Sequence, residues 1–186
     1  MKIFPELQLA FVGGWVFILF TVTIQLINLF LLVPKDVRVR LLDRSEFSTQ
    51  EKVLTGIAKL FSMILLLNIL LLPLDDPVEI VIGFMLYSFG MVGMLYATYN
   101  FKNTPHDQPV STGLYKISRN PQEVMLTIAF LGVAIAVSSW FLVIIHFISR
   151  VFNHFQILAQ EKSCILQYGD DYIGYMKKIP RYLLFF

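Results

Sequence analysis

The sequence predicts an all-α integral membrane protein, and three observations lead to this fold class. Of the 186 residues, 56% are hydrophobic, whereas soluble domains contain about 45–50% apolar residues. Long apolar runs alternate with short charged stretches, and the mean hydropathy is +0.68. All Lys and Arg residues except Lys2 and Lys59 fall in three of those stretches, residues 34–56, 101–123 and 150–186.

The apolar runs predict about five transmembrane helices. The first run, Leu7–Val33, is long enough to cross a hydrocarbon core of about 30 Å. Ser48–Glu51 is typical of a capping box and begins the helix that continues through Leu54–Leu72 as the second span. The third span is expected at Val78–Tyr99.

The region after the third span has two interpretations. Val124–Ile148 could be one span, or the chain could turn at Ser138-Ser139 and return through Trp140–Leu158. A single span would place the basic tail opposite the other two basic stretches, whereas a hairpin keeps all three on one side. We therefore expect a hairpin, and five spans in total. Its second arm carries three polar residues that should face a protein-lined or wet cavity rather than lipid: Arg150, Asn153 and His154.

The predicted elements form one membrane domain over residues 1–186. Residues 1–100 hold the first three spans, 101–123 form a loop, 124–160 form the hairpin, and 161–186 form a tail that is helical on both sides of Gly169. Loops rich in Lys and Arg stay on the cytoplasmic side of a membrane. We therefore expect the N-terminus outside, and the loop and the C-terminal tail in the cytoplasm.

Composition also argues against other classes of protein. The net charge is +2, and acidic residues are interleaved with the basic ones, so the chain lacks the charge pattern of a nucleic-acid-binding protein. Cys164 is the single cysteine, which rules out an intrachain disulfide. It has no accompanying His/Cys cluster, so we expect no metal site.

The loop at 101–123 has residue types that suit ligand binding. Gly113 permits a positive φ or a close approach of the backbone to a ligand. Tyr115 offers an aromatic face and a hydroxyl, Arg119 a planar fork of donors, and Pro121 suits the first turn of the next helix. A generic cytoplasmic loop with an Arg-Asn-Pro cap would look similar.

A second group of candidate residues follows about forty residues later. Glu161 precedes Tyr168-Gly-Asp-Asp-Tyr172, then Tyr175 and Pro180-Arg181. The hairpin would return this tail to the loop at 101–123. The alternative for Glu161 is an acid on a solvated helix face.

Together the two groups give the order Gly-x-Tyr-x-x-x-Arg-Asn-Pro, an apolar hairpin, Glu, Tyr-Gly-Asp-Asp-Tyr-x-x-Tyr and Pro-Arg. Over Phe101–Tyr182 this order resembles the isoprenylcysteine carboxyl methyltransferase and phospholipid methyltransferase superfamily. Many members have His at the position of Asn120, Tyr at the position of Glu123, and a second Glu at the position of Lys162.

The resemblance implies an integral membrane enzyme that uses S-adenosylmethionine, bound at the cytoplasmic face between the loop and the helix after the hairpin. Glu161 would anchor the ammonium or ribose hydroxyls of the cofactor. The implied cofactor-binding residues are Gln108, Pro109, Val110, Gly113, Tyr115, Arg119, Asn120, Pro121 and Glu161.

The expected reaction is methyl transfer to a lipid-like or isoprenylated acceptor, with membrane lipids as partners and the oligomeric state left open. Arg150 is the candidate catalytic residue, since it could neutralise an anionic acceptor or a lipid phosphate; alternatively it only pairs helices or snorkels. An amine acceptor would need a base, for which His154 and Glu123 are candidates. The alternatives are a sterol-reductase-like enzyme that uses NADPH and a non-catalytic small membrane protein.

Overall fold

The computed structural model describes residues 1–3, 6–8, 10–42 and 47–183, and within these ranges it is helical and contains no β-strand. The all-α prediction is therefore confirmed. The α-helices are α1 (Trp15–Leu26), α2 (Lys35–Leu42), α3 (Thr49–Leu70), α4 (Pro77–Lys102), α5 (Pro121–Ala136), α6 (Trp140–Tyr168) and α7 (Asp170–Lys178), with a π-helix at Ile27–Leu32 and a 3-10 helix at Gly113–Lys116.

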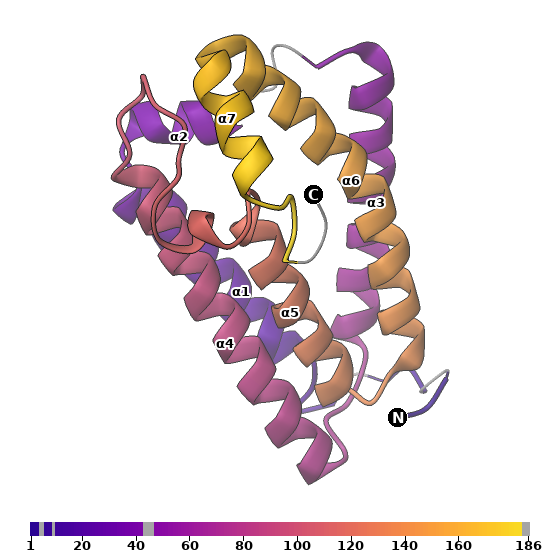
Figure 1. Ribbon diagram of the computed structural model, residues 1–186. Helices are drawn as coiled ribbons and strands as arrows, with labels where there is room; N and C mark the ends of the chain where they lie inside the picture. The colour runs from indigo at the N-terminus through magenta and orange to yellow at the C-terminus, as the bar shows by residue number, and fades with distance from the viewer. Residues whose placement is uncertain (4–5, 9, 43–46, 184–186) are drawn as a thin grey trace.

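Three of the helices, α3, α4 and α6, are long and apolar enough to cross a membrane, while α1 and α5 are shorter apolar helices. These five helices run alternately between the two ends of the molecule (Figure 1). Five crossings stay a prediction, because α1 and α5 fall short of the length of a full span.

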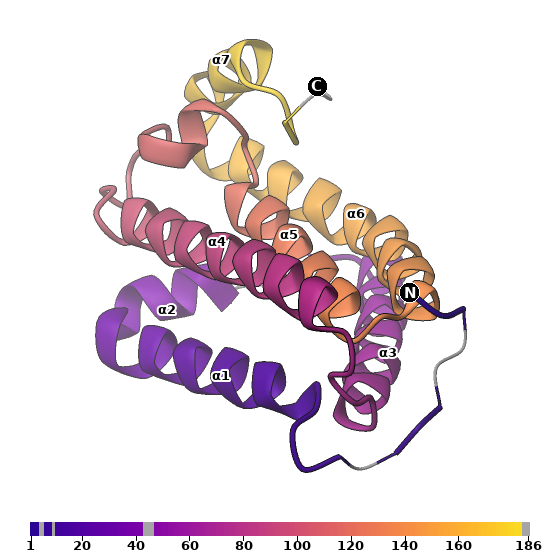
Figure 2. The same ribbon diagram turned by 90° about the horizontal axis from the view of Figure 1, so that it is seen from below.

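The bundle consists of two helix pairs. α4 packs on α5, and α3 packs on α6, whereas α5 and α6 touch much less. Figure 2 shows α5 beside α4, with α3 beside α6. Helices α5 and α6, which flank the turn at 137–139, therefore pack against different partners. This leaves a space between them.

The first helix is shorter than the sequence predicted. Helix α1 begins at Trp15, and residues 6–8 and 10–14 are not helical, so the helix is shorter than the apolar run Leu7–Val33 for which a span was expected. The reason is a docking contact, because Gly14 N donates to Leu72 O at 2.8 Å. A Cβ at Gly14 would lie 2.3 Å from Ile69 O, so only glycine lets the chain approach α3 this closely.

Helix α3 begins with the capping box that the sequence predicted. Ser48 Oγ accepts from Glu51 N at 3.3 Å, and Glu51 Oε2 accepts from Ser48 N at 2.7 Å. The helix start is therefore fixed by local side chains, independently of the segment before it.

Helices α4 and α5 approach closely at glycines. A Cβ at Gly90 would lie 2.5 Å from both Ala129 N and Met125 O, and one at Gly83 would lie 2.4 Å from Gly132 O. Small residues at a helix interface allow this separation in lipid, where close packing replaces the hydrophobic effect as the driving force. The pair fixes the position of the loop and turn that join α4 to α5.

We expect Gly90→Ala to destabilise the protein by about 1–3 kcal/mol, because the new methyl group overpacks the α4–α5 interface. Gly56→Ala is the matched control: nothing lies within 4 Å of a Cβ at Gly56 in α3, and alanine favours a helix by about 1 kcal/mol over glycine. Thermal unfolding in detergent measures both. A Gly90→Ala protein as stable as Gly56→Ala would contradict the close packing.

Candidate functional site

A polar cavity lies at the end of the bundle where α2, α7 and the loop between α4 and α5 gather (Figure 1). Its volume is about 610 Å³, which is in the range of small-molecule and cofactor sites. Its lining includes five amide side chains, those of Asn120, Gln122, Gln156, Gln160 and Gln167. Its aromatic lining comes from Phe47, Phe101, Tyr115, Tyr168, Tyr172 and Tyr175, and its acidic lining from Asp36, Glu123 and Glu161.

The wall of the cavity is organised around the buried carboxylate of Glu161. Its Oε1 accepts from Arg119 Nε at 3.0 Å and from Asn120 Nδ2 at 3.3 Å. Its Oε2 accepts from Arg181 Nε at 3.0 Å and Nη2 at 2.9 Å. The side chains of Glu161 and Arg119 are only 5% and 2% exposed. Glu161 is therefore not an acid on a solvated face.

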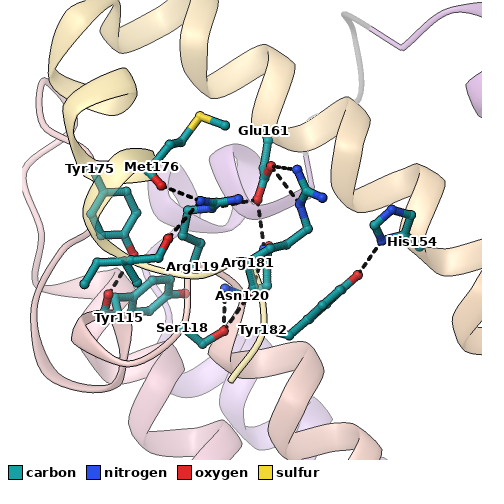
Figure 3. A network of polar contacts seen from close by, with 11 residues as sticks. Tyr115, Ser118, Arg119, Asn120, His154, Glu161, Tyr175, Met176, Arg181 and Tyr182 are labelled. Atoms are coloured by element: carbon teal, nitrogen blue, oxygen red, sulfur yellow. Dashed lines mark hydrogen bonds and ion pairs between the residues drawn. The ribbon is translucent and has the colours of Figure 1, made fainter. Parts of the chain in front are cut away.

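The same group of residues fastens the C-terminal tail. Arg119 Nη1 donates to the carbonyls of Met176 and Ile179, both at 2.8 Å, and its backbone N donates to Pro180 O at 2.9 Å. Ser118 Oγ donates to Arg181 O at 3.0 Å. Figure 3 shows these contacts converging on the turn before α5. The turn, α6 and the tail thus form one unit.

Helix α7 is tied to the loop by a buried tyrosine. Tyr175 OH donates to Tyr115 O at 2.7 Å (Figure 3). Burial raises the pKa of Tyr175, and it also raises the pKa of Tyr172. Both phenols therefore stay neutral at physiological pH, and the single proton of the Tyr175 hydroxyl is the one donated to Tyr115 O.

Gly113 has a structural role that explains why it is glycine. Its φ is +56°, and a Cβ there would lie 2.1 Å from Asn100 Oδ1. Asn100 Oδ1 instead accepts from Leu114 N at 3.1 Å. The positive φ that glycine permits is present here, and the close approach is to the Asn100 side chain of α4.

The predicted cofactor residues divide into two groups. Six of them line the cavity: Pro109, Val110, Tyr115, Arg119, Asn120 and Glu161. The other three, Gln108, Gly113 and Pro121, are not among its described lining residues. Pro121 is buried as the first residue of α5, and Asn120 before it makes no side-chain cap. The Asn120 amide is directed to Glu161 and the tail instead.

A second, apolar groove of about 730 Å³ lies between α5 and α6. Its walls include Ile128, Phe147, Val151 and Phe155, and Tyr182 and Leu183 of the tail also line it. At its polar end His154 Nδ1 and Tyr182 OH are hydrogen-bonded at 2.9 Å (Figure 3). Burial raises the pKa of Tyr182 to about 12.

Arg150, the predicted catalytic residue, lines the apolar groove. Its Nη1 lies 2.6 Å from Glu123 Oε2, which also accepts from Asn153 Nδ2 at 2.7 Å. The three polar residues predicted on α6 therefore face α5 and the tail, as expected for charged and polar groups at membrane depth. Of the described lining residues, Glu123 alone belongs to both the cavity and the groove.

Two parts of the cavity were not predicted from the sequence. Helix α2 contributes Asp36 and Val39, within a stretch for which we predicted only charge. Gln156 and Gln160 lie one turn apart on α6, and their spacing of four residues is the signal that could have placed both on one face.

Comparison with known families identifies a related family. Residues 79–170, about half of the chain, match the family model described as phospholipid methyltransferase. This region belongs to the superfamily of membrane methyltransferases that the motif order resembles, so that resemblance is confirmed. The match covers α4, α5, α6 and the loop that lines the cavity. No significant match was found among curated proteins or among solved structures.

We expect Glu161→Gln to destabilise the protein by roughly 3–5 kcal/mol, because it leaves the buried Arg119 guanidinium without its counter-charge. It should also release the tail, so trypsin should cleave faster after Lys177 and Lys178. Thermal unfolding and limited proteolysis in detergent measure these effects. Lys162→Gln, one residue further on the exposed side of α6, is the control, and equal behaviour of the two variants would contradict the ionic anchor.

Proposed function

We propose that this protein is an integral-membrane methyltransferase that transfers the methyl group of S-adenosylmethionine to a lipophilic, lipid-like or isoprenylated acceptor at the cytoplasmic membrane face. One observation carries the proposal: a polar cavity of cofactor size and an apolar groove between two helices share Glu123. A water-soluble donor and an apolar acceptor can therefore approach one point from different sides.

The residues of the cavity fit S-adenosylmethionine. The tyrosine faces and the carboxylates of Asp36 and Glu123 suit a cationic sulfonium, and the amides of Gln156 and Gln160 suit its ribose and amino-acid groups. Glu161 has a different role from the direct contact with the cofactor that the sequence led us to expect. Its two oxygens already accept four hydrogen bonds, so it holds Arg119, Asn120 and the tail in the cavity wall.

The chain would accelerate the reaction mainly by positioning. When bound, S-adenosylmethionine supplies an electrophilic methyl group. The groove holds the apolar part of the acceptor, and the Glu161 network fixes the wall of the cavity. Bringing two reactants together in a fixed orientation contributes about 7–11 kcal/mol to lowering the barrier. Tyr182 and Leu183 line the groove and would help to exclude water from it.

The cavity lining discriminates against a nicotinamide cofactor. NADPH carries several phosphates, which proteins bind with Arg and Lys. Arg119 is the one Arg or Lys residue in the described lining of the cavity. Its guanidinium already donates hydrogen bonds to Glu161 and to two carbonyls of the tail. The structure thus favours a cofactor with a positive centre over one with several negative charges.

Calorimetry on detergent-purified protein tests the proposal directly. We expect S-adenosylhomocysteine to bind and NADPH not to bind. Binding of NADPH alone would support the reductase alternative, and binding of neither ligand would leave a non-catalytic membrane protein.

A single amide in the cavity should contribute measurably to this binding. We expect Gln160→Leu to weaken S-adenosylhomocysteine by about two- to tenfold, since one net hydrogen bond contributes about 0.5–1.5 kcal/mol. Lys162→Gln lies on the same helix, outside the cavity lining, and should leave the affinity unchanged. An unaffected Gln160→Leu protein would remove α6 from the ligand site.

Orientation is tested by reporter fusions. With five crossings, the cavity end faces the cytoplasm because its loops carry the basic residues. A reporter fused after Phe186 should read as cytoplasmic, and a label at Asp75 should react from the opposite side. A reporter that reads as exported would reverse the proposed face.

A further inference from the structure

Helix α2 lines the polar cavity but is only loosely attached to the bundle. Asp36 and Val39 belong to the cavity lining, yet Val39 is 63% exposed. Of residues 35–39, only Val37 is buried. In the described part of the chain, α2 makes no extensive contact with another helix, unlike α3 with α6 or α4 with α5. Sparse packing of this kind marks a segment that can move while the rest of the fold stays intact.

The chain is interrupted just before α2 in a way that suits a hinge. In the π-helix Ile27–Leu32, Asn28 O accepts from Val33 N at 3.0 Å, five residues further on. The next carbonyl in this pattern, that of Leu29, would need an N–H at residue 34, and Pro34 has none. Val33 is extended, with φ −102° and ψ 120°, as is usual before proline. The helical hydrogen bonds therefore end at Val33 and do not continue into α2.

The two sides of this interruption are attached differently. On the α1 side, Asn28 is buried and its Nδ2 donates to Thr98 Oγ1 at 3.4 Å, which fixes the end of α1 to α4. On the α2 side, Arg38 Nη1 donates to Leu29 O at 3.4 Å, and its guanidinium lies 5.0 Å from the centre of the Phe30 ring. These contacts of Arg38 join α2 to the segment just before it and not to the opposite wall of the cavity.

A polar contact joins α2 to the loop on the other side of the cavity. Asp36 Oδ2 and His106 Nε2 are hydrogen-bonded at 3.0 Å. The loop is held toward α6 at this point, because Gln167 Nε2 donates to His106 O at 3.4 Å. The side chains of Asp36 and His106 are 66% and 52% exposed. Water and salt weaken a pair as exposed as this one, so thermal motion can open it readily.

We propose that α2 is a hinged lid over the polar cavity, with its hinge at Val33-Pro34 and its latch at Asp36 and His106. On the basis of the function proposed above, S-adenosylmethionine enters and S-adenosylhomocysteine leaves past α2, from the water side. The loop, α6 and the tail form the fixed walls, because the Glu161 network fastens them together. A lid excludes water during the reaction and controls ligand exchange. Helix α2 lies outside the matched residues 79–170, so membership of the family does not imply the lid.

The single cysteine of the chain provides a test that needs no ligand. Cys164 lines the cavity, so its rate of reaction with a bulky, disulfonated stilbene maleimide measures how often the lid opens. We expect His106→Ala and Asp36→Ala each to speed this labelling by about two- to fivefold, as loss of an exposed ion pair would. The double variant should add little, because both changes remove one contact, whereas two independent enlargements of the opening would add. Lys162→Cys in a Cys164→Ala protein, labelled on the exposed side of α6, is the control and should not respond.

Locking the lid tests the inference in the opposite direction. A protein with Asp36→Cys, His106→Cys and Cys164→Ala is loaded with radiolabelled S-adenosylhomocysteine and then bridged with a short bismaleimide. We expect the bridge to slow release of the ligand by about tenfold or more, because the lid can no longer open. N-ethylmaleimide modifies the same two cysteines without joining them and should not slow release.

The outcomes separate the lid from the proposed function. The lid would be overturned by Cys164 labelling that is equally fast in the wild type and in both latch variants, or by effects of the two variants that simply add. Release that is equally fast from bridged and unbridged protein would also overturn it. Labelling that responds to the latch, in a protein that does not bind S-adenosylhomocysteine, would support the lid and overturn the proposed function.

Discussion

The ionic contact of Glu161 with Arg119 and Arg181 is the interaction on which the functional end of the molecule depends. It joins three segments: the turn before α5, the C-terminal half of α6, and the tail after α7. A buried charge is stable only when it is paired and hydrogen-bonded. Removing any one partner would leave the others buried without a counter-charge. The positions of the three segments therefore depend on one another.

This contact fixes the position of the tail, and the tail in turn forms part of the groove wall. Its carbonyls from Met176 to Arg181 are bound by Arg119, Ser118 and Asn120. The following residue, Tyr182, then reaches His154 at the polar end of the groove. Tyr175, which lines the polar cavity, and Tyr182, which lines the apolar groove, thus belong to one short segment whose position this contact fixes. Their relative placement needs no further element.

Helices and helix caps could be predicted from the sequence far better than the tertiary contacts between them. Local signals suffice for Ser48 and Glu51, which cap a helix through neighbouring atoms alone. The loss of helix before Trp15 could not be seen, because it depends on Gly14 docking against the end of α3. Likewise Glu161 stands in the predicted site, but its oxygens face two arginines that only the folded chain brings together.

The two helix pairs explain why an ion pair sits at the junction. Helix α5 packs against α4, and helix α6 packs against α3. The facing sides of α5 and α6 therefore make few contacts with each other. Glu123 and Arg150 span that space. An apolar pair of similar size would often be at least as stable in a buried place, so stability alone does not account for the choice of charges. Under the proposed function, a reacting head group needs a polar contact where the two spaces meet, and the pair supplies it. Because the two opposite charges neutralise each other, the pair is tolerable at the edge of a membrane.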